Sequence, residues 1–377
     1  MGPLTGYKVI EMGGIGPAPF CCMILSDMGA EVIRVDRNKA NMFTEPKYDF
    51  LLRGRRSIIL NATTEKGREI LEKLLKTADV IVEGFRPGKM EKLGLGPDTL
   101  LEKYPKLVYG RMTGWGQYGP LSNSAGHDIN YIALTGALHA LGAPDSPPLP
   151  PLNLVGDFGG GGVLMALGIV SALLEREKSG KGQVIDTAMT DGTAMLMAMM
   201  YGMRWQGWWS GKRGDNLLDG AAHFYNSYET SDNKYICIGS IEPQFYSQLL
   251  KLTNAADPDF NNQWDKRNWP DLKEKFKKIF KTKTRDEWCG ILEGTDVCFA
   301  PVLSMDEAPL HPHNKARETF VDIDGVLHPA PAPNFSRTKS EIKGPPVIIG
   351  KDTDTLMKEL GFSQENIATL REEGIIS

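Results

Sequence analysis

The stretch that decides the fold is residues 7–36, which read YKVIEMGGIGPAPFCCMILSDMGAEVIRVD. Residues 7–12 are a short apolar run that predicts a buried strand, and a glycine loop at 13–16 follows it. Two prolines then stand in the first turn of a predicted helix, where proline is tolerated. Gly29 ends this helix, and residues 31–36 are the next strand. A strand, glycine loop, helix and strand in this order form a βαβ unit, so we expect a parallel sheet.

The alternation of strands and helices continues beyond this unit. The remaining predicted strands are 57–60, 80–82, 107–112 and 183–185, and the predicted helices are 64–76 and 160–178. The stretch 191–222 clusters methionine, tryptophan and glycine, and we interpret it as a long crossing connection. A strand at 235–238 and a lysine-rich amphipathic helix at 271–281 indicate a second, smaller domain of mixed pattern.

These patterns predict an α/β protein with two domains in 377 residues. The expected large domain covers residues 1–190, a crossing linker 191–223 and a small α+β domain 224–320. Proline density rises after residue 328, so 321–377 is expected to be a return linker followed by helices that pack on the large domain.

Composition excludes several classes of protein. The net charge of −4 argues against nucleic-acid binding, which normally needs a basic face. The five cysteines include the adjacent pair Cys21 and Cys22, which suits a reducing compartment better than a disulfide framework. Cysteine and histidine spacings predict no metal site. The uncharged run between Asp157 and Glu175 is short for a membrane span and fits a buried helix, and no targeting pattern stands out. We therefore expect a cytoplasmic enzyme with no membrane span.

The first glycine loop is similar to a dinucleotide fingerprint but lacks its third glycine. Asp36, at the end of the next strand, is placed where an acidic residue could hold a ribose. The alternative is a tight turn with only a packing role. Arg37 favours the phosphorylated adenosine end of a ligand, because a guanidinium pairs bidentately with phosphate. Arg37 and Arg86 can equally be solvated surface charges.

Three residues are candidates for acid–base chemistry. His127, in GHDINY at 126–131, can exchange a proton near neutral pH, although a lone histidine is more often structural. Asp157 precedes a predicted buried helix and stands beside Gly159–Gly162. It is either the helix N-cap or a carboxylate at an oxyanion site formed by glycine amides. Glu242 follows a predicted strand in the second domain and is either catalytic or a solvated loop carboxylate.

Taken together, these clusters resemble the family III CoA-transferase superfamily, and within it the α-methylacyl-CoA racemase branch. The resemblance covers nearly the whole chain. It is carried by residues 13–17, 35–37, 83–88, 126–131, 157–162, 180–186, 241–246 and 294–296. His127 distinguishes the racemase branch, because the transferase branch resembles this pattern at the aspartate but typically lacks the histidine. Glu242, in its Glu-Pro-Gln-Phe setting, points the same way.

The resemblance implies epimerisation at C2 of (2R)- and (2S)-2-methylacyl-CoA thioesters through an enolate. His127 and Asp157 are implied to be the two acid/bases on opposite faces of C2, and Glu242 to hydrogen-bond His127. No cofactor is implied, because coenzyme A is part of the substrate. The implied coenzyme A contacts are Ile15, Arg37, Leu60, Asn61, Ala62, Thr63, Arg86, Gly126, Asp128, Ile129, Asn130 and Tyr131.

The resemblance also implies an interlocked homodimer of two-domain chains, each with a Rossmann-like large domain. In it, His127 and Asp157 of one protomer share an active site with Glu242 of the other. Methionines between 189 and 203 line either the acyl site or an ordinary helix core. The rival functions are a CoA transferase with Asp157 as nucleophile, a non-catalytic CoA-binding protein and a nicotinamide dehydrogenase.

Overall fold

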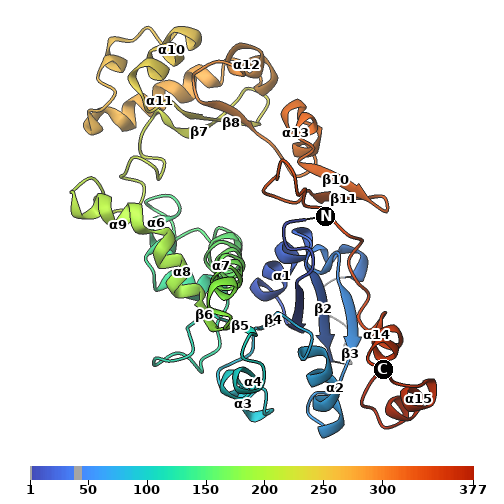
Figure 1. Ribbon diagram of the computed structural model, residues 1–377. Coiled ribbons are helices and arrows are strands. Elements are labelled where there is room, and N and C mark those ends of the chain that lie inside the picture. The colour runs from blue at the N-terminus through green and yellow to red at the C-terminus, as the bar shows by residue number, and fades with distance from the viewer. Residues whose placement is uncertain (1, 38–44) are drawn as a thin grey trace. The chain divides into compact units, whose positions relative to one another are not determined.

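The computed structural model describes residues 2–37 and 45–377, in which six parallel strands form one sheet (Figure 1). The strand order is β3-β2-β1-β4-β5-β6. The strands are β1 (Lys8–Met12), β2 (Glu31–Asp36), β3 (Arg56–Ile59), β4 (Val80–Glu83), β5 (Val108–Thr113) and β6 (Val184–Ala188). The order reverses between β1 and β4, and in open parallel sheets ligands bind at the carboxyl ends of the strands beside such a reversal. The predicted parallel α/β sheet is confirmed.

Two hydrophobic cores cover the two faces of this sheet. On one face, α1 (Pro17–Asp27) and α7 (Leu164–Ser179) pack through side chains such as Leu25 and Ile169. On the other face lie α2 (Glu65–Leu75), α3 (Lys89–Lys92), α4 (Pro97–Lys103), α14 (Thr353–Glu359) and α15 (Gln364–Glu372). Helix α2 starts where the Thr64 hydroxyl accepts a hydrogen bond from the Gly67 amide, as an N-cap does.

The glycine-rich segment before α7 differs from the prediction. Residues Leu154–Val163 form a π-helix that continues into α7, so the glycines lie inside a helix and do not present exposed amides to an oxyanion. At Gly160 and Gly162 glycine is needed because backbone of another helix passes very close. A Cβ on Gly160 would lie 2.7 Å from the amide nitrogen of Thr193 in α8 (Met189–Leu196), and one on Gly162 would lie 2.9 Å from the carbonyl oxygen of Pro17 in α1. The predicted close approach of backbone is therefore found, between helices.

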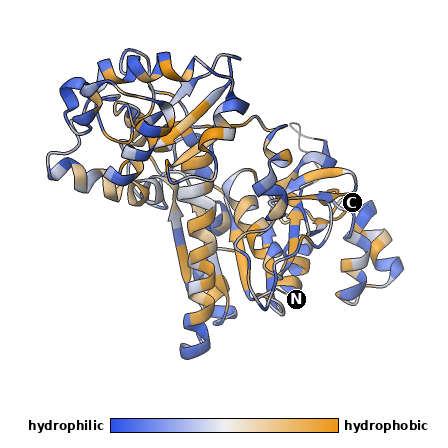
Figure 2. Ribbon diagram, turned by 90° about the horizontal axis from the view of Figure 1, so that it is seen from above, coloured by the Kyte–Doolittle hydropathy of each residue, from blue (hydrophilic) through white to orange (hydrophobic). Residues whose placement is uncertain are grey.

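Among the described residues, one continuous helical segment, Leu154–Ser179, is long and apolar enough to cross a membrane, by length and composition only. Figure 2 shows the longest helix mainly in the hydrophobic colour, with a hydrophilic end. One side of it, including Met165 and Ile169, is buried in the core against the sheet. Leu167 and Leu174 are exposed on another side.

The sheet belongs to a compact unit formed by residues 1–135, 151–196 and 318–377. It also holds α5 (Asp128–Ala133), α8 and the hairpin of β10 (Phe320–Ile323) and β11 (Val326–Pro329). The tail after residue 352 is largely helical and packs on the sheet: Leu356 and Ile367 are in the core, and Leu60 pairs with Ile376.

A second compact unit comprises residues 136–150 and 197–317. Its antiparallel sheet has the order β7 (Tyr225–Glu229), β8 (Tyr235–Gly239) and β9 (Phe299–Val302). Its helices are α6 (Ala137–Ala140), α9 (Ala198–Trp205), α10 (Pro243–Thr253), α11 (Trp269–Phe280), α12 (Arg285–Leu292) and α13 (Pro312–Ala316). An aromatic core that includes Phe224, Tyr228 and Phe276 holds the unit together. The strand at 235–238 and the helix at 271–281 are confirmed within a residue or two.

Candidate active site

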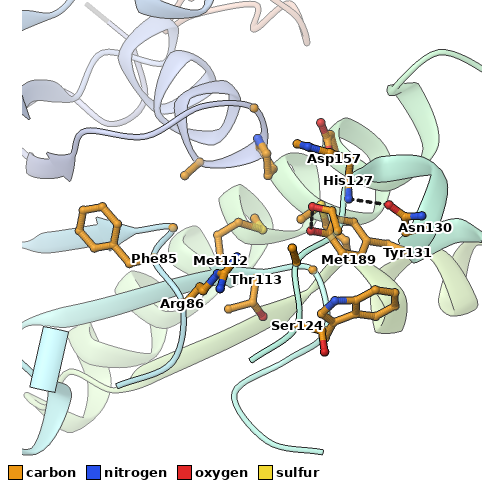
Figure 3. Close-up of a pocket in the computed structure, with 18 of the residues that line it drawn as sticks. Phe85, Arg86, Met112, Thr113, Ser124, His127, Asn130, Tyr131, Asp157 and Met189 are labelled. Carbon is orange, nitrogen blue, oxygen red and sulfur yellow. Dashed lines mark hydrogen bonds between the residues drawn. The ribbon is translucent and has the colours of Figure 1, made fainter. Parts of the chain in front are cut away.

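A cavity of about 540 Å³ opens at the carboxyl ends of β1, β4 and β5, beside the reversal of strand order (Figure 3). The loop after β1 supplies residues 15–18, the loop after β4 supplies 84–87, and the end of β5 with its following loop supplies 112–115. The start of α5 and the π-helix complete the wall. A parallel sheet brings these loops together because all its strands end at the same edge.

His127 lies at the start of α5 as its N-cap residue and lines the cavity. Its backbone nitrogen donates to the Asn130 side-chain oxygen over 3.0 Å (Figure 3). The Tyr131 hydroxyl donates to the carbonyl of Gly126, and its ring meets Trp115 edge to face at 4.8 Å between centroids. The main chain at His127 is therefore held by the Asn130 side chain and by the Tyr131 hydroxyl, and Trp115 packs against the Tyr131 ring.

Asp157 lies in the first turn of the π-helix, half-buried and facing the same cavity. The N-cap of that helix is Asn153, so Asp157 is not the cap. Burial raises the pKa of the Asp157 carboxyl. Three neighbours modify this: a hydrogen bond from the Asn153 amide over 3.2 Å lowers it, the Asp128 charge raises it and His127 lowers it. The carboxyl can thus keep a proton at higher pH than an ordinary aspartate, beside an imidazole that can exchange one.

The glycine loop lies close to Asp157. Gly16 has φ +70°, and a Cβ there would lie 3.3 Å from Oδ2 of Asp157. The loop is anchored by Arg34, which donates to the Gly14 carbonyl over 3.0 Å and pairs with the buried Glu11 at 2.5 Å. The tight turn is thus fixed from inside the sheet.

Asp36 belongs to the same buried network. Its carboxylate accepts from Arg34 at 2.8 Å and from the Ser57 hydroxyl at 2.9 Å, and only 4% of the residue is exposed. It cannot reach a ribose, so that interpretation is wrong and the dehydrogenase alternative loses its acidic residue.

Only part of the predicted site lines the cavity. Among the described residues, those that line it include Ile15, Arg86, Gly126, His127, Asn130, Tyr131 and Asp157. The predicted coenzyme A contacts that are not among the lining residues are Arg37, Leu60, Asn61, Ala62, Thr63, Asp128 and Ile129. Arg37 is exposed and lies over the Phe85 ring, with 6.0 Å from its guanidinium carbon to the ring centroid. Leu60 is buried, and the Asn61 amide donates to the Ile375 carbonyl over 2.8 Å.

Glu242 belongs to the second unit. It is exposed, directly before Pro243, and forms the N-cap of α10. Near it stands Cys298, with φ +53°; partial burial raises the pKa of its thiol, and the negative charges of Glu242 and Asp296 raise it further.

Several lining residues escaped the sequence analysis, notably Met112, Trp115, Ser124 and Met189. Met112 and Trp115 could have been found from their position, because they stand at and just after the carboxyl end of the strand predicted at 107–112, and ligands bind at that edge of a parallel sheet. Asn153 was also not predicted, because its contact with Asp157 arises only when the helical turn brings the two side chains together. Within the described ranges, no group of three or more histidine, cysteine or acidic side chains could hold a metal ion.

The sequence and the fold are similar to those of known proteins. Residues 4–353 match the family described as CoA-transferase family III. The chain is 46% identical over 376 residues to the alpha-methylacyl-CoA racemase of Mus musculus and 43% identical over 378 residues to that of Homo sapiens, with 99% of this chain and 97% of each relative covered. A crystal structure of a CAIB/BAIF family protein from Brucella suis superposes with a TM-score of 0.83 at 28% identity, covering 95% of this chain and 99% of that one.

Proposed function

The chain belongs to CoA-transferase family III, and from that membership we propose that it is an epimerase of 2-methylacyl-CoA thioesters. It interconverts the (2R) and (2S) forms by moving the proton at C2. The observation that carries the proposal is the pairing of His127 with Asp157 in one cavity, in a chain whose curated relatives at 46% and 43% identity are racemases.

In this reaction His127 and Asp157 act on opposite faces of C2. One takes the proton, and the electron pair left on carbon is delocalised onto the thioester oxygen as an enolate. The other then delivers a proton to the opposite face. The reactive form of the enzyme therefore carries one proton between the two groups, and each turnover passes it from one to the other. The raised pKa of Asp157 brings the carboxyl closer to an imidazole in proton affinity, which favours this exchange.

The enolate needs positive electrostatic potential near its oxygen. The N-cap Gly16 and the first residues of α1, Pro17 and Ala18, line the cavity, so the positive end of the α1 dipole lies at its wall. No cofactor enters this chemistry, because the coenzyme A is part of the substrate.

Coenzyme A itself is proposed to lie over the loops after β1, β2 and β4. Arg86 lines the cavity and Arg37 lies beside Phe85, which supports a cationic and aromatic surface for the phosphorylated adenosine end. Leu60, Asn61, Ala62 and Thr63 follow β3, the strand next to β2. The segment 126–131 is proposed to contact the part nearest the thioester.

We further propose an interlocked homodimer in which Glu242 of the partner subunit hydrogen-bonds His127. The homodimer is supported by the large apolar side chains that are exposed on a single chain, including Leu167 and Leu174 on α7 and Met195 on α8. Sedimentation at nanomolar concentration is expected to give a dimer, and a monomer there would contradict the arrangement.

The rival within the family is a transferase in which the Asp157 carboxylate attacks the thioester carbonyl and releases the CoA thiolate, leaving a mixed anhydride. The test compares His127→Ala and Asp157→Ala with His313→Ala, an exposed histidine on α13 of the second unit, as control. The epimerase predicts that both site variants lose epimerisation by about 100-fold or more and that the control does not. If His127→Ala keeps full activity in CoA transfer to an added carboxylate, the transferase is the correct assignment. If the protein binds CoA thioesters but performs neither reaction, it is a binding protein.

A further inference from the structure

We propose that Asp128 is a positioning residue that ties the two bases together, an inference that rests on the proposed epimerase function. Asp128 directly follows His127 in the sequence, but its side chain turns away from the cavity toward the segment that carries Asp157. It joins two parts of the chain that are 28 residues apart.

The contact is made through main-chain amides. The Asp128 carboxylate accepts from the Gly156 amide at 2.9 Å through Oδ2 and at 3.3 Å through Oδ1. Burial raises the pKa of the Asp128 carboxyl, and the backbone amides of Gly156 and Asp157 both lower it. Asp128 is only 6% exposed, so water competes little for these bonds. The buried Asp128 carboxylate thus contacts the main chain at Gly156, next to the base Asp157. The main chain of Asp128 itself continues directly into the other base, His127.

The glycine at position 156 fits this arrangement. A Cβ there would lie 2.4 Å from Oδ2 of Asp128, which is too close for any other residue without displacing the carboxylate. Gly156 and Asp128 are both buried, and a displaced carboxylate would lose its hydrogen bonds to the Gly156 amide. The tight contact between residues 128 and 156 therefore fixes the separation of the two segments.

This separation matters because a two-base epimerisation needs both groups in reach of one carbon. If the segments move apart, the first base can still remove the proton, but the second no longer meets the opposite face. The enolate is then protonated again on the face of C2 from which the proton was removed. A solvent-derived proton thereby enters C2 without inversion of configuration. A larger separation between the two bases therefore raises the ratio of exchange with retention to exchange with inversion. A general loss of folded protein, by contrast, lowers both rates equally.

The test uses the full chain with a single epimer of a 2-methylacyl-CoA in deuterated buffer. Deuterium is measured separately in the recovered substrate epimer and in the product epimer. We expect Asp128→Ala to lower the inversion rate by about 10- to 100-fold and to raise the ratio of retained to inverted deuterated product. Asp128→Asn keeps the size and one acceptor, so it is expected to fall between wild type and Asp128→Ala and serves if the alanine variant does not fold.

Asp352→Asn is the matched control. The Asp352 carboxylate also accepts a backbone amide, from Ser57 over 3.0 Å, but it lies away from the cavity. Its exchange ratio is expected to equal that of the wild type, even if its melting temperature falls.

A second measurement reports on the contact without activity. Gly156→Ala is expected to lower the melting temperature in the wild-type background and to have a smaller effect in Asp128→Ala, where the clashing oxygen atoms are gone. Equal effects in both backgrounds would overturn the inference. An unchanged exchange ratio in both Asp128 variants would also overturn it while leaving the epimerase intact. Absence of exchange and inversion in the wild type would instead overturn the epimerase and this inference with it.

Discussion

The hydrogen bond from Asn153 to Asp157 gives a pH-dependent prediction. The Asn153 amide donates to Oδ2 of Asp157 over 3.2 Å and thereby stabilises the ionised carboxylate. Asn153→Leu keeps a similar volume and removes the donor. Since Asp157 is only half-buried, water replaces part of the lost bond, and the carboxylate is destabilised by about 1 kcal/mol. Its pKa, already raised by burial, rises further.

The consequence for activity follows from the protonation of the pair. The active form holds one proton between Asp157 and His127, and at low pH both are protonated, so no base remains. A higher pKa of Asp157 moves this acid limb of kcat/KM toward higher pH. At a fixed pH on the limb, kcat/KM should fall about fivefold, since about 1.4 kcal/mol corresponds to a factor of ten. Above the limb, kcat/KM should change little. Because the equilibrium constant between epimers is fixed, both directions must shift together.

The assay measures kcat/KM from each epimer across the acid range, with circular dichroism at every pH to verify folding. Asn314→Leu is the matched control, because Asn314 is a half-buried residue whose amide donates to the Ala308 carbonyl in the second unit. It should leave the profile unchanged. An acid limb of Asn153→Leu that stays in place or moves to lower pH would refute the assignment of Asp157 as one of the two bases.

Three further predictions concern packing, charge and selectivity. Gly162→Ala should destabilise the protein by about 1–3 kcal/mol in urea unfolding, because its Cβ meets α1 backbone; Gly290→Ala, in α12 with nothing within 4 Å, should be neutral or stabilising, and a Gly162→Ala variant as stable as wild type would contradict the helix packing. Glu11→Gln should destabilise by about 3–5 kcal/mol, because it removes the buried negative charge that pairs with both Arg34 and Arg55, and a change under about 1 kcal/mol would argue against that network. Replacing Met195 and Met199 with valine should narrow the range of acyl chain lengths accepted; unchanged selectivity would argue for a simple packing role of these side chains.

The first half of the fold could be predicted because its signals are local. Residues 31–36 form a strand with the predicted bounds, and the helix after the first glycine loop begins at the predicted proline. Strand order could not be read from the chain, because it depends on which strands pair across long connections. The hairpin of β10 and β11 was missed although Asp324–Gly325 at its turn is a strong hairpin signal.

The glycine-rich segment shows where local reasoning fails. Four consecutive glycines oppose helix formation by their own propensity, yet residues Leu154–Val163 are helical. The glycines are present for another reason: α8 passes too close to Gly160, and α1 too close to Gly162, for a Cβ to fit. Similarly, the methionine and glycine composition of 191–222 hid α8 and α9.

The candidate site was predictable as a set of residue types but not as a geometry. His127 and Asp157 are found in one cavity. The buried side chain of Asp128 was foreseen only as part of a coenzyme A contact, because nothing in GHDINY indicates that the aspartate turns toward Gly156. Similarly, Asp36 stands where a ribose ligand is often found, and only the structure shows that Arg34 and Ser57 occupy it.

In the proposed reaction, two bases of this chain move the C2 proton of a 2-methylacyl-CoA. The most direct test incubates the wild-type enzyme with one pure epimer in deuterated buffer and follows C2 by NMR and chiral chromatography. We predict that deuterium appears at C2 while the mixture approaches equal amounts of both epimers. If deuterium does not enter and the epimer stays pure, while CoA passes to an added carboxylate, the claim is contradicted and the chain is a transferase.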